Sequence, residues 1–459
     1  MIHRYQKKGL NFVLDVNSGA VHLLDDISYA VSGLLDENMG DTCPQSIIDA
    51  LPDYTADEIR EAYDELYELK KAGQLFAQDD YIDVSRYIPV NAPVKALCLH
   101  VAHDCNLRCQ YCFASTGDFG QGRKIMPPEI AKKAIDFVIA RSGVRHNIEV
   151  DFFGGEPLMA WDTVTQTVDY ARSLEEKYNK KFRFTITTNG LLLDEDKRKY
   201  INENMDNCVL SLDGRREVND EFRKTVAGTG SYDTIVPKFK ALVDERDPNL
   251  DYYARGTFTS HNLDFAEDVL SIADAGFDRL SVEPVTADPG CGYDLTEDDL
   301  PKIEAEYDRL TDIMLERKKE GKPFTFFHFM VDLDQGPCVV KRLRGCGAGY
   351  EYVAVTPDGD IYPCHQFVGK EEFKQGSVLD QSFNMDIAQT FAGMNIYSRP
   401  KCQKCWAKFY CSGGCSAANY NMNHDMNDSY DLGCEMERKR LECAIYLKAM
   451  DKICANQSK

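Results

Sequence analysis

The sequence predicts an α/β protein in which a partial (β/α)6 barrel lies between an N-terminal winged helix-turn-helix domain and a C-terminal cysteine-rich domain. Three observations predict it. Strand-like and helix-like segments alternate six times between residues 94 and about 320, as in parallel strands joined by helices. A hairpin-like pattern and helical patterns precede them, and cysteines crowd together after residue 338. At 459 residues, the chain exceeds what one hydrophobic core usually organises, so two to four domains are expected.

The charge balance argues against two broad classes of partner. Lys and Arg number 53 against 75 Asp and Glu, which gives a formal net charge of −22, and no basic block stands out. Binding to nucleic acid or to a membrane is therefore not expected. The first residues lack the apolar stretch of a signal peptide and no eighteen apolar residues run together, so we expect a soluble, cytoplasmic chain. The cytosol keeps thiols reduced, so the 17 cysteines indicate metal binding rather than disulfides.

Residues 1–92 form the first predicted domain. GLNFVLDV and GAVHLLDD are short alternating runs joined at Asn17-Ser18-Gly19, so a β-hairpin is expected to open the chain. Helical patterns and a final strand-like segment follow, at 26–37, 44–51, 55–72 and 74–78. Together they indicate a small winged helix-turn-helix.

Winged helices often bind DNA, but basic residues are few here beside the many acidic ones, namely Lys7, Lys8, Lys70 and Lys71. This balance argues against DNA binding. An accessory domain that only stabilises the rest of the chain is the simpler alternative to a recognition role.

Residues 93–322 are predicted to form the barrel. Its strand candidates are VKALCLHVAH, NIEVDFFGG, RFTITTNG, CVLSLDG, YYARGTFTS and RLSVEPV. In a parallel barrel the loops after the carboxyl ends of the strands meet at one pocket. The loops that begin at His103, Gly155, Gly190, Gly214 and Pro284 should therefore converge. A long charged amphipathic helix at 295–322 would lead into the last domain, residues 323–459.

Three cysteines follow the first barrel strand, Cys105, Cys109 and Cys112 in CNLRCQYC. Three thiolates do not complete a structural zinc site, but they can hold a [4Fe–4S] cluster with one iron free. S-adenosylmethionine can chelate that iron through its amino and carboxylate groups and receive an electron from the cluster. A zinc site completed by His100 or His103 is the alternative.

Five motifs resemble those of a known family. CNLRCQYCF, FFGGEPLM, TTNG, SLDG and ARGTF follow one another at the ends of successive strands, as in the radical S-adenosylmethionine enzymes. The resemblance implies that the 154–157 edge binds the methionine amino group, that Ser211 and Asp213 lie near the ribose or carboxylate, and that Arg255 pairs with the carboxylate. The implied cofactor-binding residues are Phe113, Gly154, Gly155, Glu156, Pro157, Asn189, Ser211, Asp213 and Arg255. A plain tight turn at the glycines and an ordinary ion pair at Arg255 are the alternatives.

Seven further cysteines lie near the C-terminus, too many for one tetrahedral metal. The spacing C-x2-C-x5-C-x3-C from Cys402 to Cys415 resembles the SPASM extension of radical S-adenosylmethionine maturases, which holds two auxiliary [4Fe–4S] clusters. The resemblance implies an outer cluster on Cys402, Cys405, Cys411 and Cys434, and an inner cluster on Cys346, Cys364 and Cys415. The inner cluster then lacks a fourth ligand. Either Cys338 supplies it or one iron stays open to a substrate thiolate, and we expect the open site. Two zinc-ribbon sites are the alternative.

Other residues have plainer interpretations. His365 follows Cys364 and is a candidate proton acceptor near the inner cluster, although a hydrogen bond to cluster sulfide or plain packing would also explain it. The aromatic run Phe324, Phe326, Phe327 and Phe329 is expected to pack between the barrel and the last domain.

The whole pattern resembles the thioether-forming maturases of six-cysteine (SCIFF) peptides. The resemblance implies S-adenosylmethionine, three [4Fe–4S] clusters and a low-potential electron donor such as flavodoxin or ferredoxin. It also implies that the hairpin edge and the adjacent helix bind the leader of a cysteine-rich precursor peptide by strand addition, which raises the local concentration of the core peptide. An anaerobic sulfatase-maturing enzyme and a zinc-structured DNA-binding regulator are the alternatives.

Overall fold

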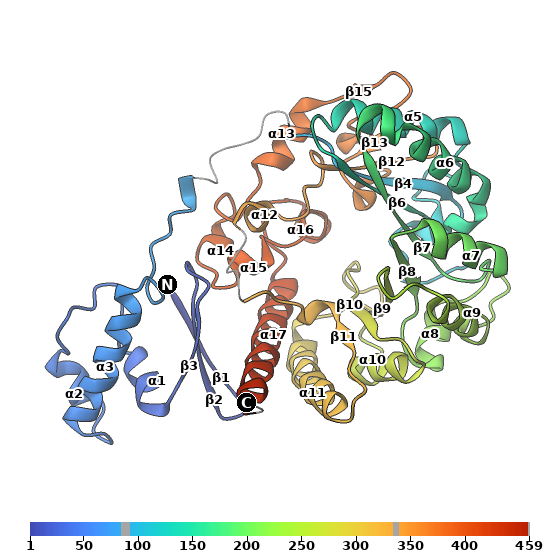
Figure 1. Cartoon of the computed structure of the whole chain (residues 1–459). Helices are drawn as coiled ribbons and strands as arrows, with labels where there is room; N and C mark the ends of the chain where they lie inside the picture. Colours follow the sequence, from blue (N-terminus) through green and yellow to red (C-terminus); the bar gives the residue numbers. More distant parts are fainter. Residues whose placement is uncertain (84–91, 334–338, 458–459) are drawn as a thin grey trace.

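The computed structural model of the chain describes residues 1–83, 92–333 and 339–457. Cys338 therefore lies outside the described residues. In Figure 1 the strands of a large sheet form an open arc with helices on its outer side, and the three-stranded N-terminal sheet lies apart from this arc. No helix in the described part of the chain is long and apolar enough to cross a membrane.

Six parallel strands form the arc, in agreement with the predicted partial (β/α)6 barrel. They lie side by side in chain order: β4 (Ala96–His103), β6 (Asn147–Gly154), β7 (Lys181–Thr188), β8 (Asn207–Ser211), β9 (Asp251–Phe258) and β10 (Arg279–Pro284). Helices connect them on the outside: α5 (Pro128–Arg141), α6 (Trp161–Tyr178), α7 (Glu195–Asn204), α8 (Arg216–Phe222), α9 (Tyr232–Asp244), α10 (Phe265–Asp274) and α11 (Leu300–Lys319). The short β5 (Lys124–Ile125) pairs antiparallel with β4.

Alternation along the strands separates the two faces of this sheet. On β6, Ile148, Val150 and Phe152 are fully buried and belong to the main hydrophobic core, whereas Glu149 and Asp151 between them are only partly buried. Since successive residues of a strand point to opposite faces, the helices cover the apolar face and the polar face turns to the inside of the arc. The functional residues at the strand ends are therefore presented to this interior.

The C-terminal region extends the same sheet. Strand β12 (Tyr352–Val355) lies parallel to β4, with Ala354 opposite Cys98, and an antiparallel meander follows through β13 (Asp360–Tyr362), β14 (Gly376–Ser377) and β15 (Ser382–Phe383). At the other edge β11 (Thr325–Phe326) pairs with β10. This continuity brings Cys364, two residues after β13, next to the barrel.

Helices make up most of the rest of the C-terminal region, and Cys402, Cys411 and Cys434 lie on three of them. These helices are α12 (Val339–Arg344), α13 (Met385–Gly393), α14 (Pro400–Gln403), α15 (Lys408–Cys411), α16 (Ser416–Asn423) and the long α17 (Asp431–Gln457). In the aromatic run, Phe324, Phe326 and Phe329 are buried in the core as predicted, but Phe327 is 49% exposed. The prediction was wrong for Phe327, which packs its ring only against the edges of Tyr253 and His328.

The N-terminal unit is a three-stranded antiparallel sheet followed by three helices. Its strands are β1 (Ile2–Lys7), β2 (Leu10–Asp15) and β3 (Val21–Leu24), and its helices are α1 (Asp26–Ser32), α2 (Gln45–Ala50) and α3 (Ala56–Lys71). The expected hairpin is β2–β3, and β1 is an additional strand. The strand expected at 74–78 does not form. Phe76 has φ 54, a left-handed conformation that no extended strand accepts, so Leu75 and Phe76 instead turn into the helical core.

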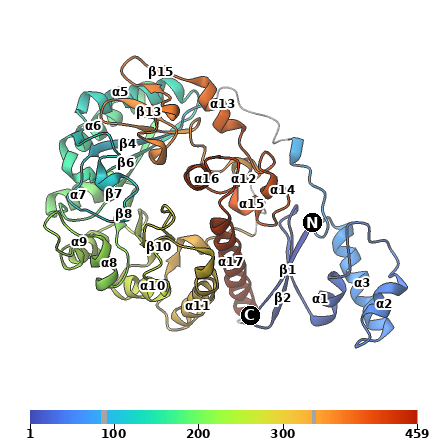
Figure 2. The same ribbon diagram turned by 180° about the vertical axis from the view of Figure 1, so that it is seen from behind.

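The N-terminal sheet is buried on both of its faces. Val13 packs with Val31 and Tyr63 of the N-terminal helices, whereas Phe12 packs with Ile445 and Tyr446 of α17 on the opposite face. Figure 2, seen from behind, shows α17 between this sheet and α11. The unit is thus packed against the rest of the chain.

Ion pairs fasten the same contact. Lys7 from β1 and Lys439 from α17 both bind the carboxylate of Asp308 on α11. After α3, Asp79 accepts hydrogen bonds from Lys408 and Tyr397 of the cysteine-rich region. These contacts fix the sheet against the domain that carries the C-terminal cysteines.

Candidate functional site

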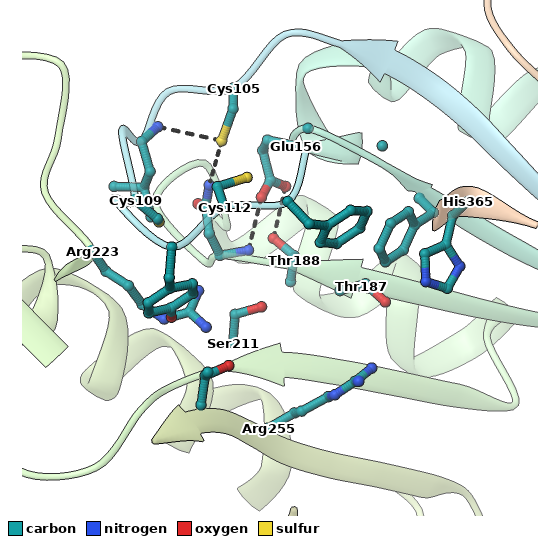
Figure 3. A pocket seen from close by; sticks show the side chains of 18 of the residues that line it. Cys105, Cys109, Cys112, Glu156, Thr187, Thr188, Ser211, Arg223, Arg255 and His365 are labelled. Carbon is teal, nitrogen blue, oxygen red and sulfur yellow. Dashed lines mark hydrogen bonds between the residues drawn. The ribbon is translucent and has the colours of Figure 1, made fainter. Parts of the chain in front are cut away.

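A cavity of about 270 Å³ lies at the carboxyl ends of the barrel strands, where the sequence predicts the site. Figure 3 shows the loop of the three cysteines above the ends of the strands, with Arg255 and His365 on the other side of the cavity. The predicted site residues that line it are Cys105, Cys109, Cys112, Phe113, Gly154, Gly155, Glu156, Pro157, Asn189, Ser211, Arg255 and His365. Segments far apart in sequence thus contribute to one pocket.

The first three cysteines lie close enough together to affect one another electrostatically. The pKa values of Cys105 and Cys109 are both raised to about 12, mainly by burial, and the nearby Cys112 contributes to each rise. Two groups favour a charged sulfur at Cys105: the backbone N–H of Leu107 donates to Sγ at 3.4 Å and Nδ2 of Asn189 at 3.5 Å. Thiols with such pKa values need a cation to ionise, which a bound metal supplies.

Two glycines allow the cysteine loop to approach β6. A Cβ on Gly154, which has φ 123, would collide with the carbonyl oxygen of Ala102, and a Cβ on Gly155 would collide with that of Asp104. The N–H of Gly155 instead donates to Ala102 O at 2.7 Å. The glycines therefore serve a close backbone approach as well as lining the cavity.

Glu156 acts within the wall of the cavity. It is fully buried and accepts hydrogen bonds from the hydroxyl of Thr188 at 2.8 Å and the backbone N–H groups of Asn189 at 2.7 Å and Leu158 at 3.0 Å. Burial raises its pKa to about 7, and these donors partly offset the rise. Its carboxylate fixes the end of β7, and with it the side chain of Asn189 beside Cys105.

Asp213 is the one predicted cofactor-binding residue that does not line the cavity. It is fully buried and accepts hydrogen bonds from Tyr111 at 2.6 Å, from Arg223 at 3.0 Å and from the N–H of Thr257 at 3.0 Å. Arg223 does line the cavity, and its charge lowers the pKa of Cys109 against the effect of burial. Sequence reasoning did not single out Arg223, because no motif surrounds it.

Arg255 and Glu283 form an ion pair at the mouth of the cavity. Arg255 lies opposite Ser211 on the neighbouring strand and is 49% exposed. A guanidinium offers five donors, so it can bind a further carboxylate. Glu283 was not predicted as a site residue, because the pattern of RLSVEPV indicates only a buried strand.

His365 lies inside the same cavity. Its ring packs against Phe113 and Phe153, with centroids 5.5 and 5.1 Å away, and Nδ1 is 3.3 Å from the hydroxyl of Tyr352. Burial lowers its pKa to about 4, and the charge of Arg255 adds to this. The imidazole is therefore neutral near pH 7. His100 and His103, by contrast, bond to each other at 3.1 Å and do not line the cavity.

The C-terminal cysteines influence one another electrostatically in two groups, one around Cys364 and one around Cys434. Burial raises the pKa of Cys364 to about 12, with further contributions from Cys415 and Cys346. Burial likewise raises the pKa of Cys434 to about 11, with contributions from Cys402 and Cys405. Cys411 belongs to the second group, because Cys434, Cys402 and Cys405 all raise its pKa.

A second cavity of about 390 Å³ is lined by Cys411, Cys415 and Cys434. Glu283 and the three residues after it line both cavities, so this segment is a shared wall. Nowhere in the described residues are three or more His, Cys, Asp or Glu side chains spaced to hold a single metal ion. Cys411 and Cys434 of one group and Cys415 of the other thus border the same cavity.

Comparisons with known proteins agree with this architecture. Residues 99–251 match the Radical SAM superfamily, and residues 346–406 match SPASM, an iron-sulfur cluster-binding domain. A cysteine-type anaerobic sulfatase-maturating enzyme of Clostridium novyi (strain NT) is 25% identical over 354 residues, 72% of this chain and 90% of that protein.

Two solved structures share the fold. Native anSMEcpe with bound AdoMet has a TM-score of 0.63 at 21% identity and covers 78% of this chain and 99% of its own. Streptococcus suis SuiB bound to precursor peptide SuiA has a TM-score of 0.52 at 16% identity and covers 93% of this chain and 97% of its own.

Proposed function

Because this chain is a radical S-adenosylmethionine protein with a SPASM iron–sulfur domain, we propose that it forms thioether crosslinks within a ribosomally made, cysteine-rich precursor peptide. Each crosslink would join a cysteine sulfur to a carbon of an acceptor residue. The observation that carries the proposal is the wall shared by two cavities, one beside Cys105 and one beside Cys415. A peptide at this wall would reach both groups of thiols.

Cys105, Cys109 and Cys112 would hold the first [4Fe–4S] cluster. Bound there with S-adenosylmethionine, this cluster supplies a 5′-deoxyadenosyl radical that abstracts a hydrogen atom. In this assignment the Gly154–Pro157 edge receives the amino group and Arg255 the carboxylate, beside Ser211. Asp213 contributes indirectly, because its carboxylate holds Arg223 and Tyr111.

The C-terminal thiols would hold two auxiliary [4Fe–4S] clusters, the outer on Cys402, Cys405, Cys411 and Cys434, and the inner on Cys346, Cys364 and Cys415. The grouping of these thiols supports the division. Three protein ligands would leave one iron of the inner cluster open to the peptide thiolate. Cys338 would close that iron if it were a fourth ligand.

The reaction balances as a two-electron oxidation of the peptide. A C–H and an S–H bond break and one C–S bond forms. The hydrogen atom would go to 5′-deoxyadenosine, the thiol proton to solvent, with His365 at the cavity wall as the candidate group that passes it on, and the remaining electron to an auxiliary cluster. A flavodoxin or ferredoxin in the cytoplasm would supply the electron that cleaves S-adenosylmethionine.

The N-terminal sheet would recognise the leader. Among the described residues β3 pairs only with β2, so one edge remains for strand addition, and Leu23 on β3 is 42% exposed. The face that carries Phe12 is packed against α17, which fixes a bound leader relative to the barrel. SuiB, which has been solved with its precursor peptide, resembles 93% of this chain.

Oxidation of a Ser or Cys in a sulfatase is the second candidate, supported by the similarity to the Clostridium novyi enzyme. Mass spectrometry separates the two reactions. The anaerobically reconstituted enzyme is incubated with a cysteine-rich precursor peptide, which is first sought in the small open reading frames adjacent to its gene. We expect loss of two hydrogens per bridge, together with one cysteine that no longer reacts with an alkylating agent. A carbonyl product on a sulfatase peptide, with the precursor peptide unchanged, would contradict thioether formation.

A further inference from the structure

Below the first cavity, the inside of the barrel carries a second layer of side chains. Phe153, Thr187, Ser211 and Arg255 line the cavity from four successive strands. Alternate residues of a strand point to the same face, so the residues two positions earlier face the same interior, one layer deeper. They are Asp151, Thr185, Val209 and Tyr253. In a closed barrel this layer would be packed core, but here all four remain partly exposed.

Asp151 places a carboxylate in this layer. It lies opposite Thr185 on the neighbouring strand, and the hydroxyl of Thr185 donates to it. Burial raises the pKa of Asp151 to about 6, the negative charge of Glu149 adds to the rise, and no cation among the described residues offsets it. An ionised carboxylate has about four acceptor sites, so Asp151, which is partly exposed on the inside of the barrel, can accept further hydrogen bonds from a ligand.

An apolar patch lies at the other side of the layer. The ring of Tyr253 meets the ring of Phe327 edge-on at 5.4 Å, and its hydroxyl is 3.9 Å from Sδ of Met330. Phe327 is 49% exposed and Met330 is 59% exposed. Large apolar side chains left open in one place mark a binding surface.

We propose that this layer is the floor of the peptide-binding site and selects the sequence around the acceptor residue. Asp151 accepts a hydrogen bond from a hydroxyl, carboxamide or ammonium side chain, and the patch of Tyr253, Phe327 and Met330 takes an apolar side chain. Three strand spacings separate β6 from β9, about 14 Å in all, which an extended peptide spans in about four residues. The two substrate side chains that Asp151 and the apolar patch bind therefore lie about four positions apart in the peptide sequence. This inference rests on the proposed function.

Two synthetic peptides that differ in one side chain test the carboxylate. Acetyl-Gly-Thr-Gly-Gly-Gly-Leu-Gly-amide, which has Thr and Leu four positions apart, and its analogue with Val in place of Thr differ only by a hydroxyl for a methyl group. Anaerobic equilibrium dialysis measures their binding to the reconstituted, full-length enzyme in the presence of S-adenosylmethionine. We expect the Thr peptide to bind about tenfold more tightly, as befits a hydrogen bond to a charged group. Asp151→Leu should bring the ratio of the two dissociation constants to about one. Glu149→Leu, one layer deeper, should leave this ratio at its wild-type value.

The apolar patch has its own comparison. Replacing Leu by Ser in the Thr peptide should weaken binding to wild type and have little effect on binding to Phe327→Ser. An unchanged Thr to Val ratio in Asp151→Leu, or equal losses in both strand variants, would overturn the assignment. So would a wild-type enzyme that binds neither peptide. Thioether formation in the natural precursor, measured in the same preparations, reports separately on the proposed function.

Discussion

The imidazole of His3 lies flat on the indole of Trp406, with ring centroids 3.8 Å apart and planes within 2° of parallel. Trp406 directly follows Cys405, and Nε2 of His3 is also 2.9 Å from a carboxylate oxygen of Glu442 on α17. The first strand of the chain thus touches the loop assigned to the outer cluster. The N-terminal sheet is therefore packed firmly against the C-terminal region.

Removing the stacking of His3 on Trp406 should lower the stability of the protein. Stacked rings and one hydrogen bond together contribute about 1–2 kcal/mol, so His3→Ala should lower the melting temperature by a few degrees. His3→Phe keeps the stack and should lose only part of that amount. Differential scanning fluorimetry of the reconstituted protein provides the measurement. Equal melting temperatures for all three proteins would mean that the contact contributes nothing to stability.

Leader recognition can be tested without removing the N-terminal sheet. Its deletion would uncover Ile445 and Tyr446, which pack against Phe12, so a point variant is cleaner. Leu23→Asp places a charge on β3 and should weaken precursor binding about tenfold, while uncoupled cleavage of S-adenosylmethionine stays at the wild-type rate. The control is Leu379→Asp, a leucine of similar exposure (50%, against 42% for Leu23) in the C-terminal region. Equal binding by both variants would remove β3 from the recognition surface.

The cluster assignment predicts the iron content. Three four-iron clusters correspond to about twelve irons per chain. Replacing Cys105, Cys109 and Cys112 together by Ala should remove about four of them and abolish 5′-deoxyadenosine formation, because the C-terminal thiols form separate groups. Iron and sulfide analysis measures this. Near-stoichiometric zinc in the wild type, or loss of all iron in the variant, would contradict the assignment.

The raised pKa of Asp151 makes a prediction about stability. Its folded pKa of about 6 exceeds the unfolded value of about 3.9, so the folded protein binds more protons between these values and loses stability as pH rises through them. Asp151→Asn should therefore stabilise the protein above pH 6, by up to about 3 kcal/mol, and have little effect near pH 4. Urea unfolding of the apoprotein at both pH values measures the difference. A variant less stable than wild type at pH 7.5 would show that the carboxylate is structural.

The inner cluster should respond to a thiol. In the proposed assignment three protein ligands leave one iron open, and coordination to iron favours the thiolate of a peptide cysteine, whose free thiol has a pKa of about 8.5. Adding a cysteine-containing peptide should shift the electron paramagnetic resonance spectrum of the reduced enzyme, and Cys338→Ser should behave like wild type. No shift in wild type, with a shift in Cys338→Ser, would identify Cys338 as the fourth ligand.

Much of the site could be predicted because its residues are close in sequence or end successive strands. The spacing of Cys105, Cys109 and Cys112 brings three thiols onto one loop, and the parallel order of the strands brings Asn189, Ser211 and Arg255 to the same rim. Such local patterns survive folding because each depends on a few neighbouring residues. The division of the C-terminal thiols into two ligand sets came from the resemblance to the SPASM extension and stays a prediction.

The remainder depends on contacts between distant segments. Asp213 turns away from the cavity because Arg223 and Tyr111 bind it, and no sequence pattern announces that network. The burial of both faces of β2 requires α17, more than 400 residues later. The strand expected at 74–78 does not form because Phe76 has a positive φ. The apolar residues of this segment gave no sign of that conformation.

Transfer of deuterium tests the central claim most directly. The precursor is labelled with deuterium at the acceptor residue and incubated with enzyme, S-adenosylmethionine and reductant, and both products are analysed by mass spectrometry. Thioether formation predicts one deuterium in 5′-deoxyadenosine for each bridge, lost from the same carbon that becomes bonded to sulfur. Bridges that retain all of the label, or deuterium transferred into 5′-deoxyadenosine without any carbon–sulfur bond, would contradict it.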